Sequence, residues 1–205
     1  MATRVLLLRH GQSTWNAEGR WQGWADPPLT ELGETQAREA VPALAPFGFT
    51  VIVTSDLRRA QRTSDILAEG LHIATIRTDP GLRERSMGDW TGLTTSEIEL
   101  RWPDATKGRN IGVEALPPGG EAAGRFPERV KAALLRLAAD FPEQRVLGIA
   151  HGAVIQMLDE QLGLEPLVLI GALGGRWYDV TPDQIVPLDP FSPVLPTPVP
   201  EDRRP

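Results

Sequence analysis

Short apolar runs alternate with longer, partly polar segments along most of the chain. Residues 5–8 (VLLL), 50–55 (TVIVTS) and 145–150 (RVLGIA) are the clearest apolar runs. Each is short and largely apolar, which predicts strands that are buried on both faces. Strands that alternate with helical segments predict a layered α/β domain.

Capping residues and apolar periodicity predict four helices around these strands. Thr30 is a candidate N-cap of the first helix, and Ser55 or Asp56 of the second. Gly163 has the place of a C-terminal stop for the last helix. The predicted helices run from Thr30 to about Leu44, from near Arg58 onwards, over residues 122–140, and from Ala153 to about Leu162.

Other segments have weaker patterns. Residues 71–78 (LHIATIRT) are predicted as a third strand, and 176–180 (RWYDV) with 184–188 (QIVPL) as a late hairpin or sheet edge. Residues 102–120 contain prolines and glycines without a clear period, which predicts a long loop, and such loops are often lids. We predict a single domain over residues 1–186.

Proline dominates the end of the chain. Residues 187–205 include seven prolines among nineteen residues, which excludes helix and favours extended chain. We predict a separate proline-rich tail here. Such a tail could reach a neighbouring subunit, so a homo-oligomer stays open.

Composition narrows the function classes. The 205 residues suffice for one substantial domain, and the absence of cysteine excludes disulfides and thiolate metal sites. No apolar run approaches the ~20 residues of a membrane span and no signal-peptide pattern is present, so we expect a cytoplasmic protein. The formal charge of -6 argues against non-specific nucleic-acid binding. Arginine outnumbers lysine by 19 to 2, and guanidinium groups suit bidentate phosphate binding.

Two of the three histidines share an unusual setting. His10 and His151 each lie within two residues of the end of a predicted buried strand, and each precedes a glycine. Parallel neighbouring strands would bring both imidazoles, with Arg9 beside the first, to the crevice beyond the strand ends, where open α/β sheets bind ligands. His72 has no such setting and is predicted to be a surface or strand residue.

Further charged residues could meet at the same crevice. Arg59 lies at the start of a helix that leaves a strand end, and helix N-termini favour anions. Arg58 and Arg62 are instead predicted to form a solvated basic face. Glu84 follows a strand-like run among glycines and an aromatic residue, although solvent exposure is the ordinary interpretation of any single glutamate.

Six motifs in order support a more specific interpretation. Together they resemble the histidine phosphatase superfamily, branch 1, which includes cofactor-dependent phosphoglycerate mutases and many phosphomonoesterases. The motifs extend over about three quarters of the chain and are LLLRHGQSTWN, GRWQGWADPPLTELGETQA, SDLRRAQRT, LRERSMGDWTGL, PPGGE and VLGIAHG.

The resemblance implies a three-layer α/β/α sandwich with a mostly parallel central sheet, as in phosphoglycerate mutases. It implies a site that needs neither a metal ion nor a cofactor. It also implies a catalytic core and a set of phosphate or substrate contacts. The implied catalytic residues are Arg9, His10, Arg59, Glu84 and His151, and the implied contacts are Asn16, Gln22, Gly23 and Gly152.

These residue types suit a phosphomonoesterase that acts on a small phosphorylated metabolite. His10 would attack phosphorus and form a phosphohistidine. Arg9 and Arg59 would neutralise the phosphate charge, as phosphoryl transfer requires. Glu84 would protonate the leaving oxygen and then activate the hydrolytic water.

A phosphoglycerate mutase is the first alternative. The mutases carry an insertion that helps cover the site, and the corresponding segment, from Glu84 to His151, is shorter here. PPGGE is typical of the family's phosphatases, and Gln22 stands where the mutases usually have a small hydroxyl residue. The second alternative is a catalytically weak binding module, disfavoured because every catalytic position is filled. Lys107 and Arg109 could meet a substrate carboxylate or be exposed loop charges.

Overall fold

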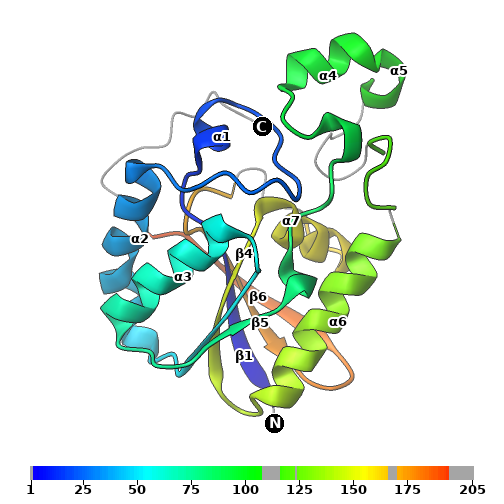
Figure 1. Ribbon diagram of the computed structural model, residues 1–205. Coiled ribbons are helices and arrows are strands. Elements are labelled where there is room, and N and C mark those ends of the chain that lie inside the picture. Colours follow the sequence, from blue (N-terminus) through cyan, green and yellow to red (C-terminus); the bar gives the residue numbers. More distant parts are fainter. Residues whose placement is uncertain (1, 108–115, 123, 166–169, 194–205) are drawn as a thin grey trace.

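The computed structural model describes residues 2–107, 116–122, 124–165 and 170–193, and shows one mixed sheet between helices (Figure 1). The strands lie in the order β3-β2-β4-β1-β5-β6. The first four run parallel, β5 is antiparallel to β1, and β6 is antiparallel to β5. The strands are β1 (Thr3–Arg9), β2 (Val51–Thr54), β3 (Ile76–Thr78), β4 (Arg145–Ala150), β5 (Gly175–Val180) and β6 (Ile185–Phe191).

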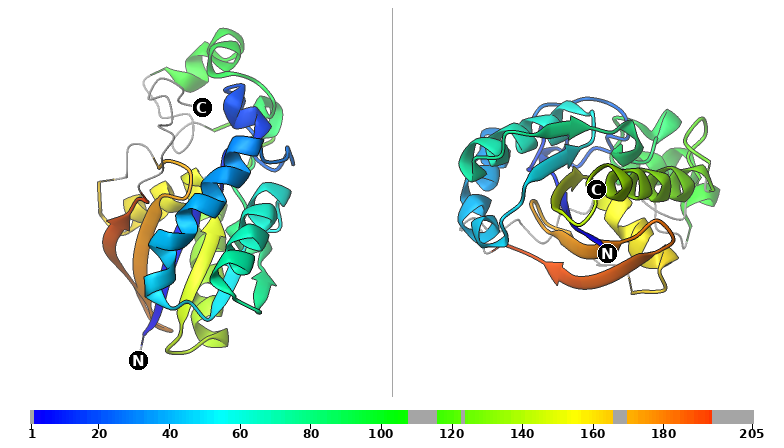
Figure 2. Two further views of the ribbon diagram at one scale, coloured as in Figure 1. Left: turned by 90° about the vertical axis from the view of Figure 1, so that its left-hand side faces the viewer. Right: turned by 90° about the horizontal axis from the view of Figure 1, so that it is seen from below.

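Helices cover both faces of this sheet. The helices α2 and α3 pack on one face, and α6 and α7 pack on the other, which gives three layers (Figure 2). The predicted α/β/α sandwich is confirmed. None of the described helices is long and apolar enough to cross a membrane. The helices are α1 (Thr14–Ala17), α2 (Glu31–Leu44), α3 (Arg58–Leu71), α4 (Thr95–Arg101), α5 (Pro103–Thr106), α6 (Arg125–Asp140) and α7 (Gly152–Gln161), with 3-10 turns at Ala45–Phe47, Pro80–Leu82 and Gly88–Trp90.

The apolar run of β1 serves both faces of the sheet. Val5 and Leu7 pack into the core beneath α6 and α7, whereas Leu6 and Leu8 pack into the core beneath α2 and α3. All four side chains are fully buried, because successive residues of a strand point to opposite faces. A strand in the middle of this sheet therefore needs apolar residues at every core position.

The strand predicted over residues 71–78 is mostly wrong. Leu71 completes the last turn of α3, and His72 follows in the left-handed conformation, with a φ of 57°, that ends the helix. Ile73 then packs into the core, and only Ile76–Thr78 pairs with β2. Apolar residues that finish a helix and fill the core produce a strand-like pattern here. His72 is exposed, as predicted.

The predicted side-chain cap of α3 is also wrong. The N-cap residue is Leu57, and no side chain caps the helix. Asp56 instead forms an ion pair with Arg83, and the Ser55 hydroxyl lies 2.9 Å from Nε2 of His151. Both candidate capping residues are therefore used in long-range contacts.

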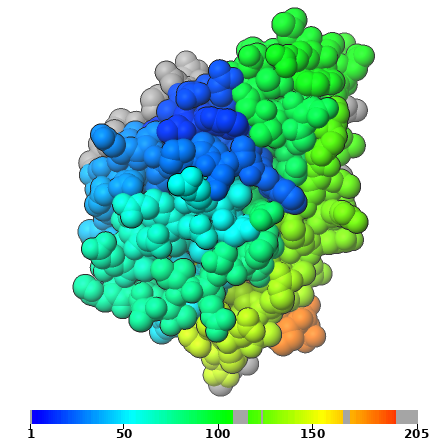
Figure 3. All heavy atoms as spheres, in the orientation of Figure 1, coloured from blue at the N-terminus to red at the C-terminus, as the bar shows by residue number. Residues whose placement is uncertain are grey.

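A helical segment over residues 88–106 lies above the carboxyl ends of the strands. Met87, Trp90 and Ile98 form a small core of their own, against which Trp21 packs. Trp21 Nε1 also donates a hydrogen bond to Thr95 Oγ1 at 3.1 Å. Figure 3 shows the green surface of this segment continuous with the blue surface of the N-terminal residues. The segment is thus attached to the body of the protein through the loop that follows β1.

The long loop predicted over residues 102–120 contains a helical turn. α5 occupies its start, so the loop prediction is wrong there. Lys107 is exposed, whereas Arg109 lies among residues 108–115, outside the described part of the chain. A lid role for this segment stays a prediction.

The predicted late hairpin is confirmed as β5 and β6 at one edge of the sheet. β6 contains Pro187 and Pro190, so the proline-rich segment begins inside the sheet. Residues 194–205 lie outside the described part of the chain. For them, a separate tail stays a prediction.

A close backbone approach joins α2 to the loop after β1. A Cβ atom on Gly33 would lie 2.1 Å from the Gln12 carbonyl oxygen. We expect Gly33→Ala to lower the free energy of unfolding by about 1–3 kcal/mol, because the backbone must shift to relieve this overlap. Gly171→Ala is the control, since a Cβ there meets nothing within 4 Å, and should change the value by about 0.5 kcal/mol or less. Urea denaturation measures both, and equal stability of the two variants would contradict the prediction.

Candidate active site

The carboxyl ends of β1 and β4 bring two histidines together. Arg9 lies opposite Ala150 in the parallel register of these strands, and the His10 backbone N donates to the Ala150 carbonyl oxygen at 3.1 Å. The ring centroids of His10 and His151 are 5.1 Å apart, with an interplanar angle of 66°. The two imidazoles thus meet at one end of the sheet, as the strand pattern predicts.

Hydrogen bonds determine which nitrogen of His10 carries its hydrogen. Nδ1 lies 2.6 Å from the Gly11 carbonyl oxygen, which can only accept, so Nδ1 is the protonated nitrogen. Nε2 accepts from Arg59 Nε at 3.1 Å and therefore carries a lone pair. The pKa of His10 lies well below its ordinary value, because burial and then the charges of Arg59 and Arg9 disfavour the imidazolium. His10 is therefore neutral, with an unprotonated lone pair on Nε2.

Arg59 extends from the first turn of α3 into the site. Its Nη1 donates to the Ala25 carbonyl oxygen at 2.8 Å, and its Nη2 donates to the Gly23 carbonyl oxygen at 3.0 Å. Burial lowers the pKa of Arg59 to about 10, so it remains a cation at neutral pH. By contrast, Arg58 is exposed and Arg62 pairs with a surface carboxylate, as expected for a solvated face.

His151 is fully buried and is the N-cap residue of α7. Ser55 Oγ accepts from Leu57 N at 3.3 Å and lies 2.9 Å from His151 Nε2, to which it can donate or from which it can accept. The other ring nitrogen, Nδ1, has no hydrogen-bond partner among the described residues. Burial, followed by the charge of Arg59, holds the pKa of His151 well below its ordinary value. The site thus contains a second neutral imidazole, whose Nδ1 is left without a protein partner among the described residues.

Arg9 lies at the end of β1, beside the start of α7. Its Nη1 donates to the Ile170 carbonyl oxygen at 2.7 Å. A Cβ atom on Gly152 would lie 3.8 Å from Arg9 Cδ, so Gly152 adjoins this side chain. Burial lowers the pKa of Arg9, and the nearby carboxylate of Glu84 opposes that shift. The electrostatics of the site therefore include two guanidinium groups and one carboxylate.

Glu84 lies at the N-terminus of α7. Its Oε1 accepts from the Arg85 backbone N at 2.9 Å, and its Oε2 accepts from the Ala153 backbone N at 3.4 Å. Burial raises the pKa of Glu84, and these donors with the two guanidinium charges offset the shift only in part. A raised pKa lets the carboxyl keep its proton closer to neutral pH, which suits a general acid.

Two of the remaining predicted contacts, Asn16 and Gln22, lie against Ser13, which the sequence alone does not single out. Ser13 Oγ lies 2.9 Å from Asn16 Oδ1 and 2.7 Å from Gln22 Oε1. Gly23 has a φ of 49° and offers its carbonyl oxygen to Arg59. These residues therefore belong to one loop that is connected to the site. Their contact with phosphate stays a prediction.

Two residues beside the site, Ser55 and Arg129, are not predicted as site residues from the sequence. Ser55 follows β2, a strand next to β4. Its position at the carboxyl end of a neighbouring parallel strand is a sequence signal for a site residue. Arg129 on α6 donates to the Glu84 carbonyl oxygen at 3.2 Å across 45 residues of chain. No spacing connects these two positions, so only the tertiary structure reveals the pair.

The groups gathered at this end of the sheet suit a phosphate group. Arg9 and Arg59 supply N–H donors, and the N-terminus of the ten-residue helix α7 adds the positive end of its dipole. His151 Nδ1, which has no protein partner among the described residues, can be a further donor. A dianionic phosphomonoester is complementary to this set. Across the described ranges, no group of three or more His, Asp or Glu side chains is arranged to hold a metal ion.

A mostly parallel α/β/α sandwich with paired histidines and arginines at neighbouring strand ends defines a phosphoglycerate mutase-like protein. The family model of the histidine phosphatase superfamily (branch 1) matches residues 5–169. The chain belongs to this family.

Individual relatives include both phosphatases and mutases. Glucosyl-3-phosphoglycerate phosphatase of Mycobacterium tuberculosis is 37% identical over 182 residues, which cover 85% of this chain and 81% of the relative. A 2,3-bisphosphoglycerate-dependent phosphoglycerate mutase of Methylobacterium radiotolerans is 41% identical, with 78% and 80% covered. The solved structure of mycobacterial glucosyl-3-phosphoglycerate phosphatase has a TM-score of 0.74 at 33% identity, with 87% of this chain and 90% of that chain covered.

Proposed function

We propose that the protein is a phosphomonoesterase that hydrolyses a small phosphorylated metabolite through a phosphohistidine on His10. The observation that carries this proposal is the buried, unprotonated Nε2 of His10, which lies 3.1 Å from Arg59 Nε. A phosphate oxygen that takes over this N–H frees the lone pair on Nε2 and places phosphorus beside it. Family membership supports the same chemistry.

The first half of the reaction transfers the phosphoryl group to the protein. A bond forms between Nε2 of His10 and phosphorus while the bond from phosphorus to the ester oxygen breaks. Glu84 gives its proton to the departing oxygen, which leaves as an alcohol. Arg9, Arg59 and the His151 N–H hold the phosphoryl oxygens throughout.

The second half restores the protein. Glu84, now a carboxylate, takes a proton from a water molecule that attacks the phosphohistidine. The bond from phosphorus to Nε2 breaks, and inorganic phosphate leaves. No proposed step uses a metal ion or cofactor. We also propose a cytoplasmic location. The sequence contains no cysteine, so the fold does not depend on disulfides that form in an oxidising compartment.

A panel of phosphomonoesters tests this proposal. It would include 3-phosphoglycerate and glucosyl-3-phosphoglycerate, because relatives named for phosphoglycerate chemistry align over most of the chain. We expect release of inorganic phosphate, and the ranking of the panel identifies the substrate class. Interconversion of phosphoglycerates much faster than phosphate release, in the presence of 2,3-bisphosphoglycerate, would establish the mutase alternative instead.

Two adjacent arginines offer a matched test of the phosphate site. Arg59→Lys keeps a positive charge but loses the fork that spans His10 Nε2 and two carbonyl groups. We expect kcat/KM to fall about 100- to 1000-fold, as for removal of a donor that stabilises transition-state charge. Arg58→Lys changes an exposed side chain and should leave kcat/KM unchanged. Similar losses in the two variants would contradict the assignment of Arg59.

A further inference from the structure

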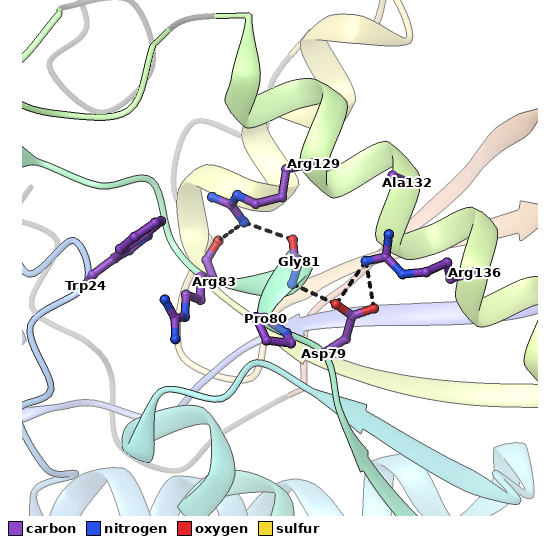
Figure 4. Close-up of a pocket in the computed structure, with 8 residues that line it drawn as sticks. All are labelled: Trp24, Asp79, Pro80, Gly81, Arg83, Arg129, Ala132 and Arg136. Atoms are coloured by element: carbon purple, nitrogen blue, oxygen red, sulfur yellow. Dashed lines mark hydrogen bonds and ion pairs between the residues drawn. The ribbon is translucent and has the colours of Figure 1, made fainter.

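Arg129 binds the main chain that carries Glu84. It projects from α6 toward Gly81 and Arg83 (Figure 4). Its Nη1 donates to the Gly81 and Arg83 carbonyl oxygens, both at 2.9 Å, and its Nη2 donates to the Glu84 carbonyl oxygen at 3.2 Å. One guanidinium group therefore holds three carbonyl groups of a single short segment.

Glu121, the last residue of PPGGE, fixes this guanidinium in turn. Nε and Nη2 of Arg129 donate to its two carboxylate oxygens at 2.8 and 2.7 Å, a bidentate geometry that lysine cannot form. The Glu121 backbone N also donates to the Ser86 carbonyl oxygen at 3.1 Å. Glu121 is thus connected to the chain on both sides of Glu84. Through Arg129 it is linked to residues before Glu84, and through its own backbone N it is linked to Ser86, which follows.

The main-chain carbonyl and the carboxyl group of Glu84 each accept two hydrogen bonds. Trp24 Nε1 donates to the Glu84 carbonyl oxygen at 2.7 Å, as a second donor beside Arg129. The carboxyl group has two backbone donors, at 2.9 and 3.4 Å. Because the side chain is attached to this main chain and its shorter hydrogen bond comes from the next residue, Arg85, the position of the carboxyl group depends on where the main chain is held.

We infer that Arg129, fixed by Glu121, is a positioning residue for Glu84 as the proton donor, an inference that rests on the proposed function. Arg129 does not reach the reacting atoms. It holds the main chain so that the Glu84 proton can pass to the ester oxygen. This transfer accompanies the breaking of the bond from phosphorus to that oxygen and the formation of the bond from phosphorus to His10 Nε2. A displacement of about 1 Å at such a group costs about 100-fold in rate.

Arg136 is a matched control on the same helix. Arg129 and Arg136 line one pocket of about 340 Å³ (Figure 4). Arg136 pairs with Asp79 at 3.0 Å, and within the described structure it has no hydrogen bond to residues 81–84. Arg136 is linked to Gly81 through Asp79, whose Oδ1 accepts from Gly81 N at 2.7 Å. Its replacement therefore alters the same surface and leaves the hydrogen bonds from Arg129 to the Glu84 segment in place.

The test compares Arg129→Lys and Arg136→Lys on two kinds of substrate. One is the alkyl phosphate of the panel that the wild type hydrolyses fastest, whose leaving oxygen needs a proton. The other is p-nitrophenyl phosphate, whose phenolate leaves without one. We expect Arg129→Lys to lower kcat/KM about 10- to 100-fold on the alkyl phosphate and less than about 3-fold on the aryl phosphate. Arg136→Lys should change neither value by more than about 2-fold.

Each outcome bears on the inference. Equal losses on both substrates, or no loss on either, would overturn it. Glu84→Gln in the same assay separates the two proposals: equal losses in that variant contradict the acid role itself, whereas a selective loss there without one in Arg129→Lys contradicts only the positioning role. If a low melting temperature shows that Arg129→Lys is unfolded, Glu121→Gln, which keeps one acceptor for Arg129, must show the same selectivity.

Discussion

Replacing His10 with alanine is expected to abolish phosphate release, lowering kcat/KM on the order of 10,000-fold or more. Without Nε2 no nitrogen is present to bond to phosphorus, so water would have to displace the alcohol in one step. Inorganic phosphate release on the best substrate of the panel measures the loss. Circular dichroism of the variant checks that it is folded.

An exposed histidine provides the control for this experiment. His72 has a φ of 57°, which asparagine tolerates, and His72→Asn should keep full activity. Rapid denaturation of the wild type during turnover should trap phosphate in a form stable to alkali and lost in acid, as expected of a phosphoramidate. Activity that persists in His10→Ala, or trapped phosphate that survives acid, would refute the phosphohistidine.

Replacing Glu84 with glutamine should lower kcat/KM on alkyl phosphates about 100- to 10,000-fold, the usual contribution of general acid catalysis. Glutamine has nearly the same shape and keeps one oxygen, which can replace the carboxylate oxygen that accepts from the Arg85 backbone N–H at 2.9 Å. It cannot give a proton to the leaving oxygen. The loss should be much smaller on p-nitrophenyl phosphate, and steady-state kinetics on both substrates measures the difference.

The pKa shifts of His10 and Glu84 predict the direction in which kcat/KM changes with pH. The reaction needs His10 neutral and Glu84 protonated. The pKa of His10 is lowered, so the nucleophile is already neutral below its ordinary range, and the pKa of Glu84 is raised, so the acid keeps its proton to higher pH. In the wild type, kcat/KM should therefore fall as pH rises through the raised pKa of Glu84. Glu84→Gln should lose this limb.

Glu99 supplies a carboxylate control, because it is exposed on α4. Glu99→Gln should show the wild-type profile with its fall at high pH. A falling limb that survives in Glu84→Gln would assign the proton to another group.

Patterning along the chain predicts the elements whose residues face the core. β4 has the predicted bounds because every residue after Arg145 is buried, and a buried strand admits few polar residues. Residues 71–78 are predicted poorly because Leu71 and Ile73 are apolar for other reasons, namely a helix end and a core contact. Local sequence does not distinguish these uses, since tertiary packing decides between them.

The same distinction applies to the site. His10 and His151 are predictable because each follows a strand. In parallel neighbouring strands the carboxyl ends lie side by side, so both histidines come to the same end of the sheet. Arg59 and Glu84 depend on the family resemblance, because a charged residue on a helix or loop is usually solvated. Arg129 has no signal at all, since its hydrogen bonds join segments that lie far apart in the chain.

The two edges of the sheet have a consequence for how molecules meet. β3 has only three residues, and β6 carries Pro187 and Pro190, which have no N–H to donate. Exposed strand edges are the usual templates for aggregation and for dimers that continue a sheet from one subunit into the next. One edge strand is short and the other is interrupted by proline. Both edge strands therefore disfavour the addition of a further strand.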